Sequence, residues 1–261
     1  MKLLRALSTF ALSLAILISA GCQSASTTSG DAAAGAKVLR VGVTSSLAPM
    51  AFKQGGELVG LEVEAARELG KQLGRPVQFV EVKWEDQIPA LLAGRTDIIM
   101  SSMTITPERR MRVAFSNPYL RVGQMMLIKR SDGSQYSLGV PPVLPGTVGV
   151  LKGTVGEFYV QREFSSSDRR AFGTAADAVS ALLAGRINSF ISDASIIWYQ
   201  AALHESDGLG VVPRQLTNET LGWAVRPNDA ELLKQANDFI AARQANGSLN
   251  AMIKRWLPLA N

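Results

Sequence analysis

The chain has 261 residues, of which 47% are hydrophobic, 19% charged and 7% aromatic. This composition excludes a disordered or fibrous protein, and the length is sufficient for two lobes. The formal net charge is +5, but two of the 27 basic residues lie in residues 1–21, which contain no acidic residue, so 25 basic and 22 acidic residues remain. The resulting charge of +3 predicts no nucleic-acid partner. One cysteine and one histidine exclude an intrachain disulfide and a zinc site of the Cys/His type, and a Ser-His-Asp triad would depend on His204 alone.

The N-terminus has the pattern of a secretory signal. Two basic residues precede an apolar run from residue 6 to residue 18, which is shorter than the roughly 20 residues that a membrane-spanning helix needs. Small residues then precede Cys22, an ending similar to the lipobox of bacterial lipoproteins, although Ser19 stands where leucine is more usual. We expect a signal peptide over 1–21 and lipid attachment at Cys22; the alternative is an ordinary signal with an incidental cysteine. Twelve of the fourteen residues from 23 to 36 are Ser, Thr, Ala or Gly, so 22–36 is predicted to be a flexible tether of an extracytoplasmic domain.

From residue 38 onward, short strand-like runs alternate with helical periods, which predicts an α/β architecture. In chain order, we expect a strand over 38–43, a helix over 62–73, a strand over 77–82 and a helix that ends at Ala93. Glycine or proline follows each of the two helices and supplies its stop signal.

One six-residue segment occurs twice. Ala-Leu-Leu-Ala-Gly-Arg at 90–95 recurs 91 residues later at 181–186, and each copy leads into an apolar strand, predicted over 96–100 and 187–192. Polar residues stand at the ends of these strands, namely Ser101 and Ser102 in the first copy and Ser192 and Asp193 in the second. Because ligands of open α/β sheets bind at the carboxyl ends of strands, the repeat predicts two facing walls of a crevice. The alternative is a common helix ending repeated by chance.

The segment after the first polar exit predicts an anion site. Thr106 suits a helix N-cap and Pro107 the first helical position, so Arg109 is expected in the first turn of a short helix. A cation there adds to the positive end of the helix dipole, and a guanidinium meets a carboxylate with two hydrogen bonds. The alternative is a surface arginine paired with a nearby acid.

The second half of the chain contains a similar feature. A strand over 147–151 precedes Lys152-Gly153-Thr154-Val155-Gly156 and a helix expected to begin near Glu157, whose exposed amides would form another anion cradle. No GxxxxGK[ST] or GxGxxG pattern occurs, so nucleotide binding has no specific support. The alternative is an ordinary strand-to-helix turn.

Asp193 completes this set of residues. A carboxylate at the end of a buried strand requires a structural arginine or a bound cation. If Arg109 holds a carboxylate and Asp193 an ammonium, their joint ligand is an α-amino acid. Trp84 would form the floor of its side-chain pocket through stacking or cation–π contact, or would instead pack in the core.

At this point the residues resemble the bacterial solute-binding protein family 3, the extracytoplasmic amino-acid receptors of ABC importers. The likeness spans nearly the whole mature domain, in family order. It rests on Gly60-Leu61-Glu62-Val63-Glu64, Asp97-Ile98-Ile99-Met100-Ser101-Ser102-Met103-Thr104 through Arg109, Ala114-Phe115-Ser116-Asn117-Pro118-Tyr119, Lys152-Gly153-Thr154, Asp193, and Gly222-Trp223-Ala224-Val225 to Trp256.

The resemblance implies a type II periplasmic-binding-protein fold, in which each of two lobes is a mixed β-sheet flanked by helices. Lobe 1 is expected at 37–118 plus 222–261 and lobe 2 at 124–216, joined by two hinge strands at about 119–123 and 217–221. It also implies that a ligand touching both lobes binds the closed form more tightly than the open form. A membrane partner would then recognise the closed form.

The resemblance further assigns roles to single residues. The ligand's α-carboxylate is assigned to Arg109, Ser102, Thr104, the Thr154 hydroxyl and the Val155 amide; Asp193 takes the α-ammonium and Trp84 is an aromatic wall. Three positions depart from relatives: the position of Leu47 is commonly aromatic, that of Val155 is frequently threonine, and that of Thr44 is often an acid in receptors for cationic amino acids, which argues against a basic amino acid as the ligand. Glu62 remains near the site as a further ligand-binding candidate.

The expected function is capture of a small amino acid-like zwitterion and its delivery to the permease of an ABC importer. The expected protein is a monomer in the periplasm or at the cell surface, anchored through Cys22, without cofactor or metal. One rival is an enzyme that resembles cyclohexadienyl dehydratase, with Glu157 or Glu62 as candidate general acid. Another is a receptor of the same fold that signals to a sensor instead of feeding an importer.

Overall fold

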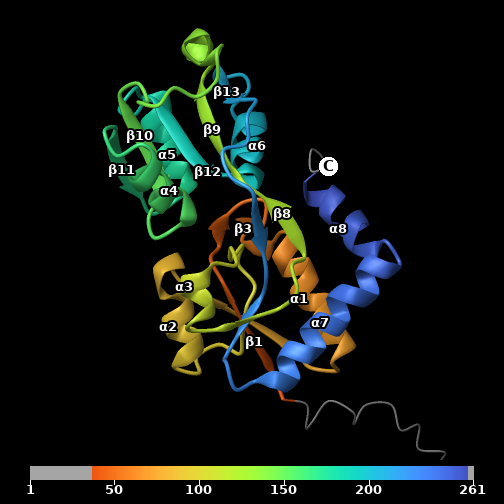
Figure 1. Cartoon of the computed structure of the whole chain (residues 1–261). Coiled ribbons are helices and arrows are strands. Elements are labelled where there is room, and N and C mark those ends of the chain that lie inside the picture. Colours follow the sequence, from red (N-terminus) through yellow and green to blue (C-terminus); the bar gives the residue numbers. More distant parts are fainter. Residues whose placement is uncertain (1–36, 258–261) are drawn as a thin grey trace, which may run out of the picture. The chain divides into compact units, whose positions relative to one another are not determined.

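Two five-stranded mixed sheets organise the computed structural model, which describes residues 37–257 (Figure 1). We call the part around the first sheet lobe 1 and the part around the second sheet lobe 2. The first sheet has the order β5-β1-β6-β15-β7, and the bounds of its strands are Val77–Glu81, Leu39–Val43, Ile98–Ile99, Ala224–Val225 and Ala114–Phe115. The second has the order β11-β10-β12-β9-β13, with bounds Asp168–Phe172, Thr147–Leu151, Ser189–Asp193, Gln124–Lys129 and Leu209–Val212.

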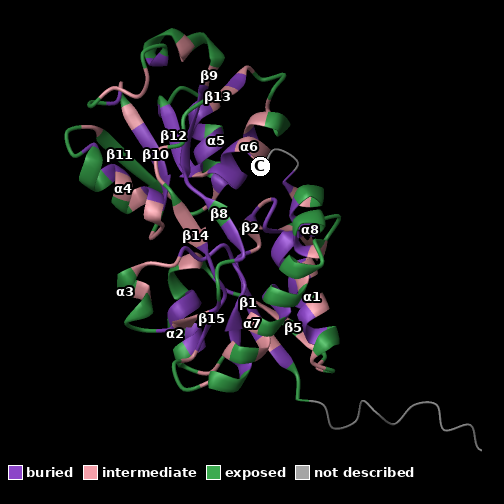
Figure 2. Cartoon of the chain, turned by 45° about the vertical axis from the view of Figure 1, so that its right-hand side comes forward, coloured by how far each residue is buried: buried purple, intermediate pink, exposed green. Residues whose placement is uncertain are grey.

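Helices cover both sheets. Those of lobe 1 are α1 (Leu61–Gln72), α2 (Gln87–Leu92), α3 (Pro107–Arg110), α7 (Ala230–Ala245) and α8 (Ser248–Trp256), with a 3-10 turn at Trp84–Asp86 and a small sheet of β2 (Ser46–Leu47), β3 (Ala51–Gln54) and β4 (Glu57–Val59). Those of lobe 2 are α4 (Val155–Glu163), α5 (Ala175–Leu183) and α6 (Ala194–Leu203), with a 3-10 segment at Arg130–Tyr136. The strands of both sheets are mostly buried, while the outer faces of the helices are exposed (Figure 2).

The chain passes between the sheets through two strands, β8 (Leu120–Val122) and β14 (Glu219–Leu221), which pair antiparallel. They lie within the two stretches expected to be hinges, at 119–123 and 217–221. The expected signal peptide, Cys22 and the tether at 22–36 lie outside the described residues, as do residues 258–261. Within 37–257, no helix combines the length and apolar character needed to cross a bilayer.

The repeated segment has the same geometry in both lobes. Gly94 and Gly185 follow α2 and α5 with φ of 71° and 68°, and each donates its amide hydrogen to a leucine carbonyl, Leu91 or Leu182, at 3.0 Å. The strands that follow, β6 and β12, pair parallel with β1 and β10, respectively. The recurrence is therefore structural and places the polar ends of β6 and β12 at corresponding edges of the two sheets.

Leu47 makes one of the apolar contacts between the two lobes. It belongs to β2 of lobe 1, yet its buried side chain packs in the hydrophobic cluster of lobe 2, together with residues such as Leu151, Phe190 and Ile196. Phe52 of β3 also contacts Tyr199 of α6, with ring centroids 5.7 Å apart. These apolar contacts connect the lobes beside β8 and β14.

Candidate functional site

Arg109 is positioned by the expected helix cap. The Thr106 hydroxyl accepts the Arg109 amide hydrogen at 3.3 Å, and α3 begins at Pro107. The guanidinium donates to the Thr104 carbonyl at 2.9 Å and lies over Trp84, with 5.3 Å between Cζ and the ring centroid. Desolvation lowers its pKa, which nearby acids only partly offset. Because Arg109 forms no ion pair with any residue in 37–257, the alternative of an arginine held by a surface acid does not describe it.

Ser102 and Thr104 follow β6 and face the opposite lobe. Ser102 has a φ of 55°, and it is the one non-glycine residue with positive φ in the described chain. Its buried hydroxyl oxygen has no hydrogen-bond partner among residues 37–257. The Thr104 hydroxyl donates to Glu219 at 3.1 Å. A strained backbone that presents an unpaired hydroxyl is typical of a binding site.

The wall of lobe 2 begins with Thr154, the N-cap of α4. Its hydroxyl accepts the Glu157 amide hydrogen at 3.4 Å and donates to the Leu151 carbonyl at 2.7 Å, while the Glu157 carboxylate accepts the Gly153 amide at 2.7 Å. The Thr154 cap starts the helix at Val155, two residues before the expected start at Glu157, and Glu157 is the third helical residue.

Asp193 ends β12 on the same wall. Its Oδ1 accepts a hydrogen bond from Gln124 Nε2 at 2.7 Å. Desolvation, followed by the nearby negative charge of Glu219, raises the pKa of Asp193 from 3.8 to about 7. The carboxyl forms no ion pair within 4.0 Å in the described chain, so the cation that it requires is not supplied by residues 37–257.

A small cavity between the lobes brings most of these residues together. Its volume is about 20 Å³, and it is lined by Leu47, Trp84, Ser102, Thr104, Leu151, Thr154, Val155, Ser192, Asp193 and Ile196. Typical ligand pockets measure roughly 300–1,000 Å³. The walls are in direct contact, since Trp84 Nε1 donates to the Gly153 carbonyl at 3.0 Å and Lys152 pairs with Glu85 at 3.6 Å. A ligand of amino-acid size therefore requires the walls to separate.

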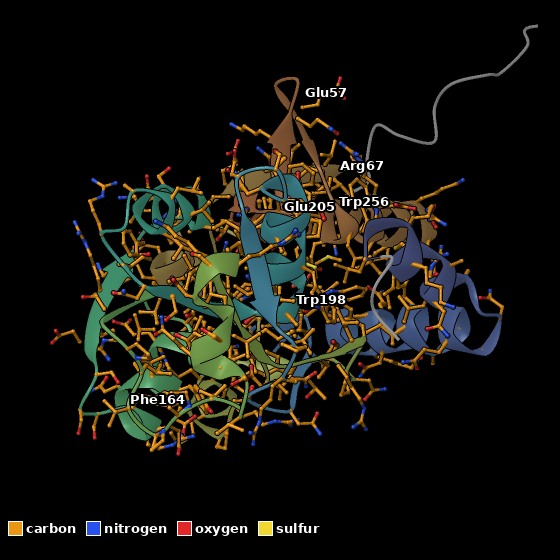
Figure 3. All side chains as sticks on the ribbon, turned by 90° about the horizontal axis from the view of Figure 1, so that it is seen from above. Glu57, Arg67, Phe164, Trp198, Glu205 and Trp256 are labelled. Atoms are coloured by element: carbon orange, nitrogen blue, oxygen red, sulfur yellow. The ribbon has the colours of Figure 1, made fainter. Side chains whose placement is uncertain are left out.

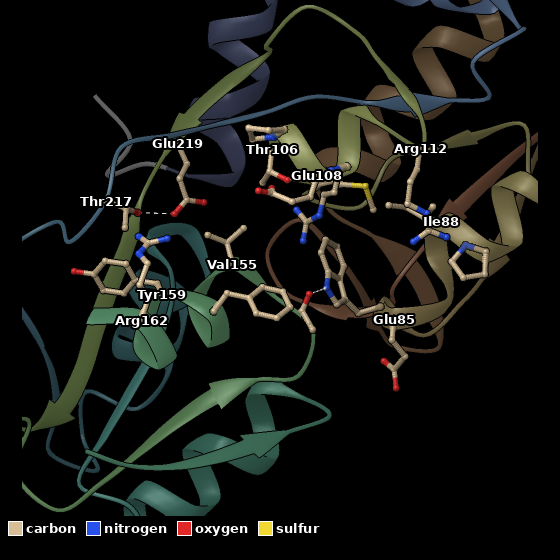
Figure 4. A pocket seen from close by; sticks show the side chains of 17 residues that line it. Glu85, Ile88, Thr106, Glu108, Arg112, Val155, Tyr159, Arg162, Thr217 and Glu219 are labelled. Atoms are coloured by element: carbon tan, nitrogen blue, oxygen red, sulfur yellow. Dashed lines mark hydrogen bonds between the residues drawn. The ribbon is translucent and has the colours of Figure 1, made fainter. Parts of the chain in front are cut away.

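A larger groove of about 790 Å³ shares Trp84 and Val155 with this cavity (Figure 4). Arg109 and the aromatic residues Phe158 and Tyr159 of α4 also line it. Glu219 and Thr217 lie at its end near the strand that returns to lobe 1, and the Thr217 hydroxyl donates to Glu219. The groove thus extends the cavity from the two walls towards solvent.

Two of the candidate residues have other surroundings. Glu62 is buried behind Ser102: its carboxylate accepts hydrogen bonds from the Ser102 amide at 2.9 Å, from the Tyr119 hydroxyl, and from Trp223 Nε1 at 2.9 Å. Glu62 lines neither the cavity nor the groove and holds Ser102 in place. Thr44 is likewise buried, donating to the Val82 carbonyl and accepting from Gln87.

Glu219 and Gln124 were not anticipated from the sequence. Glu219 begins β14, and Gln124 begins β9, immediately after the other crossover strand. The Gln124 side-chain amide donates to both Asp193 and Glu219, and its own oxygen is buried without a partner within 37–257. The sequence did contain a signal for these two residues. An acidic residue lies within one predicted crossover strand and an amide residue directly follows the other, where the chain borders the crevice.

A second hollow lies away from these residues, between β8, α6 and α8. It measures about 790 Å³, and a neighbouring hollow of about 110 Å³ is lined by Trp198 of α6 and Trp256 of α8 (Figure 3). None of the candidate site residues lines either one. Within the described chain, no three His, Cys, Asp or Glu residues are grouped as metal ligands.

Comparison with known proteins gives consistent relatives. The sequence profile of the bacterial extracellular solute-binding proteins, family 3, matches residues 39–259. The L-cystine-binding protein TcyJ of Escherichia coli (strain K12) is 30% identical over 84% of this chain and 82% of its own length. ABC transporter arginine-binding protein 1 of the same strain is 27% identical over 87% of this chain and 93% of its own.

A solved structure is similar over a comparable range. It is an ancestral amino acid-binding protein described as a precursor of cyclohexadienyl dehydratase, 33% identical, with a TM-score of 0.77 over 84% of this chain and 95% of that one. The expected type II binding-protein fold with two sheet-containing lobes is thereby confirmed.

Proposed function

The chain belongs to the bacterial extracellular solute-binding proteins of family 3, and from this premise we propose that it captures an amino acid-like zwitterion between its lobes and delivers it to the permease of an ABC importer. One observation carries the proposal. Arg109 on lobe 1 and Asp193 on lobe 2 are desolvated charges of opposite sign, and neither has an ion-pair partner within 37–257. A ligand with a carboxylate and an ammonium would compensate both.

The neighbouring groups support the same orientation of the ligand. The unpaired Ser102 hydroxyl and the N-terminal end of α4 at Thr154 and Val155 suit a carboxylate held by Arg109. Trp84 offers its ring to the remainder of the ligand, and Leu47 also lines the cavity. We assign Glu62 the role of orienting Ser102.

Transport follows from the way the lobes are connected. We propose that β8 and β14 act as hinges, so that a ligand bound to both walls shifts the population towards the closed form by the difference between its affinities for the two forms. The permease would recognise and bind this closed form. We also propose that Cys22 anchors a monomeric protein to the membrane from the extracytoplasmic side.

The two carboxyl groups considered for an enzymatic general acid do not reach the cavity or the groove. Glu157 accepts the Gly153 amide hydrogen, and Glu62 is enclosed behind Ser102. The two relatives named above by sequence are binding proteins. We therefore favour binding over dehydration; formation of phenylpyruvate or phenylalanine from prephenate or arogenate by the purified protein would reverse this preference.

Substitution of Arg109 tests the binding function. Calorimetric titration of the twenty amino acids against the wild-type protein identifies a ligand, and Arg109→Ala should then lose at least about 100-fold in affinity, because it removes charge-assisted hydrogen bonds to the carboxylate. Arg110→Ala is the matched control, since Arg110 is exposed on the same helix and should leave binding unchanged. Equal affinity of wild type and Arg109→Ala would refute the carboxylate role.

A further inference from the structure

Glu219 is a charged group of the cleft that the proposed zwitterion does not use. Its carboxylate accepts hydrogen bonds from Thr104 of lobe 1 at 3.1 Å and from Gln124 of lobe 2 at 3.2 Å. It forms no ion pair within the described chain, and it lines the groove (Figure 4). Its position on β14 places a negative charge where the two lobes meet.

This charge lies close to Asp193. Gln124 Nε2 is 2.7 Å from Asp193 Oδ1 and 3.2 Å from Glu219 Oε1, so the two carboxylate oxygens are no farther apart than the sum of these distances, 5.9 Å. The proximity of Glu219 is one of the causes that raise the pKa of Asp193. The structure therefore keeps two carboxyl groups together with one shared neutral donor, which is electrostatically unfavourable unless one of them is protonated or a cation joins them.

The charges of Arg109, Asp193 and Glu219 together specify the charge of the ligand. Arg109 contributes one positive charge, and Asp193 and Glu219 contribute two negative charges when ionised. A zwitterion adds no net charge and leaves one negative charge uncompensated, whereas a ligand with two cationic groups and one carboxylate makes the site neutral. The remaining charged residues of the groove are exposed and screened by solvent, namely Glu85, Glu108, Arg112 and Arg162.

The groove beside Glu219 suits an aliphatic side chain that ends in a cation. Trp84 lines it from lobe 1, and Val155, Phe158 and Tyr159 line it from lobe 2. Phe158 is 57% exposed. Aromatic faces of this kind attract both methylene groups and cations.

Resting on the binding function proposed above, we propose that Glu219 selects an amino acid whose side chain carries a second cationic group, an ammonium or a guanidinium. Thr44 cannot take this role, because its buried hydroxyl is bonded to Val82 and Gln87 and carries no charge. The selecting acid instead comes from the strand that joins the lobes. Glu219 thus couples recognition of the side chain to closure.

Pairs of ligands that differ in the side-chain cation test the assignment on the wild-type protein. Calorimetry should show arginine binding at least about tenfold more tightly than citrulline, and lysine at least about tenfold more tightly than norleucine, because each second member lacks the cation. Equal affinity within both pairs, or preference for the neutral members, would overturn the proposal. This comparison requires no variant to fold.

The variant Glu219→Gln then tests whether Glu219 is the residue that selects the cationic side chain. It keeps the size and an accepting oxygen, and it should lose at least about tenfold in affinity for arginine and lysine and less than about threefold for citrulline and norleucine. Glu57→Gln, at an exposed acid of β4 that lines neither the groove nor the cavity, should change neither. Equal losses for charged and neutral ligands would overturn the role of Glu219 while leaving the binding function intact. Absence of binding by any of the four ligands, or binding that persists in Arg109→Ala, would overturn the binding function as well.

Discussion

Asp193 is a carboxyl group whose pKa, about 7, lies within the range of environmental pH. Desolvation and Glu219 raise it, and Gln124 and Arg109 oppose the rise only in part. The empty site therefore tends to hold a proton at the position where a ligand would place an ammonium. Binding of an amino acid must displace that proton when the pH is below the pKa.

The affinity for an amino acid should therefore fall as the pH is lowered. The ammonium and carboxylate of the ligand keep their charges between pH 5 and 8, so Asp193 is the group of the site whose titration changes. Affinity should be constant above about pH 7 and fall by up to about tenfold for each unit below it. Titration calorimetry at pH 5, 6, 7 and 8 measures this slope.

Asp193→Asn is the matched variant for this profile. It should bind α-amino acids more weakly at pH 8 but with an affinity that no longer depends on pH, and it should affect deaminated analogues less. A flat profile in the wild-type protein, or an equal loss for amino acids and their deaminated analogues, would contradict the ammonium contact.

The elements that carry the site were largely predictable because their signals are local. The cap at Thr106, the helix stop at Gly94 and the polar residues at the ends of β6 and β12 each depend on a few adjacent residues. The predicted strand over 96–100 proved shorter, with ladder pairing only at Ile98–Ile99. Its first residues bond elsewhere: Arg226 donates to the Thr96 carbonyl at 2.6 Å.

The surroundings of single side chains were not predictable, because their partners are distant in the chain. Glu62 meets Tyr119 across 57 positions and Trp223 across 161. Leu47 packs in the other lobe, and Glu219 of β14 shares the Gln124 donor with Asp193 of β12. No local pattern encodes these long-range contacts. The roles of the individual site residues stay predictions.

The two repeated helix ends allow a test at the level of elements. Gly94→Ala and Gly185→Ala each place a side chain at positive φ and should each lower the free energy of unfolding by about 1–2 kcal/mol. Gly133→Ala is the control, because Gly133 has no positive φ and open space around it. Urea denaturation measures the differences. A loss confined to one of the two copies would contradict their structural equivalence.

At the scale of the molecule, the hydrogen bond from Trp84 to Gly153 holds the two lobes against each other. Trp84→Phe keeps an aromatic ring but removes the donor, and should shift the equilibrium of the ligand-free protein towards the open form by about two- to tenfold. Small-angle X-ray scattering should then give a larger radius of gyration without ligand and an unchanged one at saturation. Identical scattering of both ligand-free proteins would show that this bond does not control closure.

The proposed attachment to the membrane also concerns the whole molecule, and it would depend on Cys22, which lies outside the described residues. If Cys22 carries the lipid, Cys22→Ser should move the protein from the membrane fraction to the soluble extracytoplasmic fraction, with ligand affinity unchanged. Fractionation followed by immunoblotting measures the distribution. Persistent membrane association of the variant would exclude this anchor.

The place of Trp84 has a practical consequence for spectroscopy. Of the four tryptophans, Trp223 is fully buried, and Trp198 and Trp256 line the hollow of about 110 Å³, whereas Trp84 borders both the cavity and the groove. The emission colour of an indole depends on its contact with water. Solutes that bind between the lobes should therefore alter the intrinsic fluorescence chiefly through this one ring, which provides a label-free optical assay without any introduced dye.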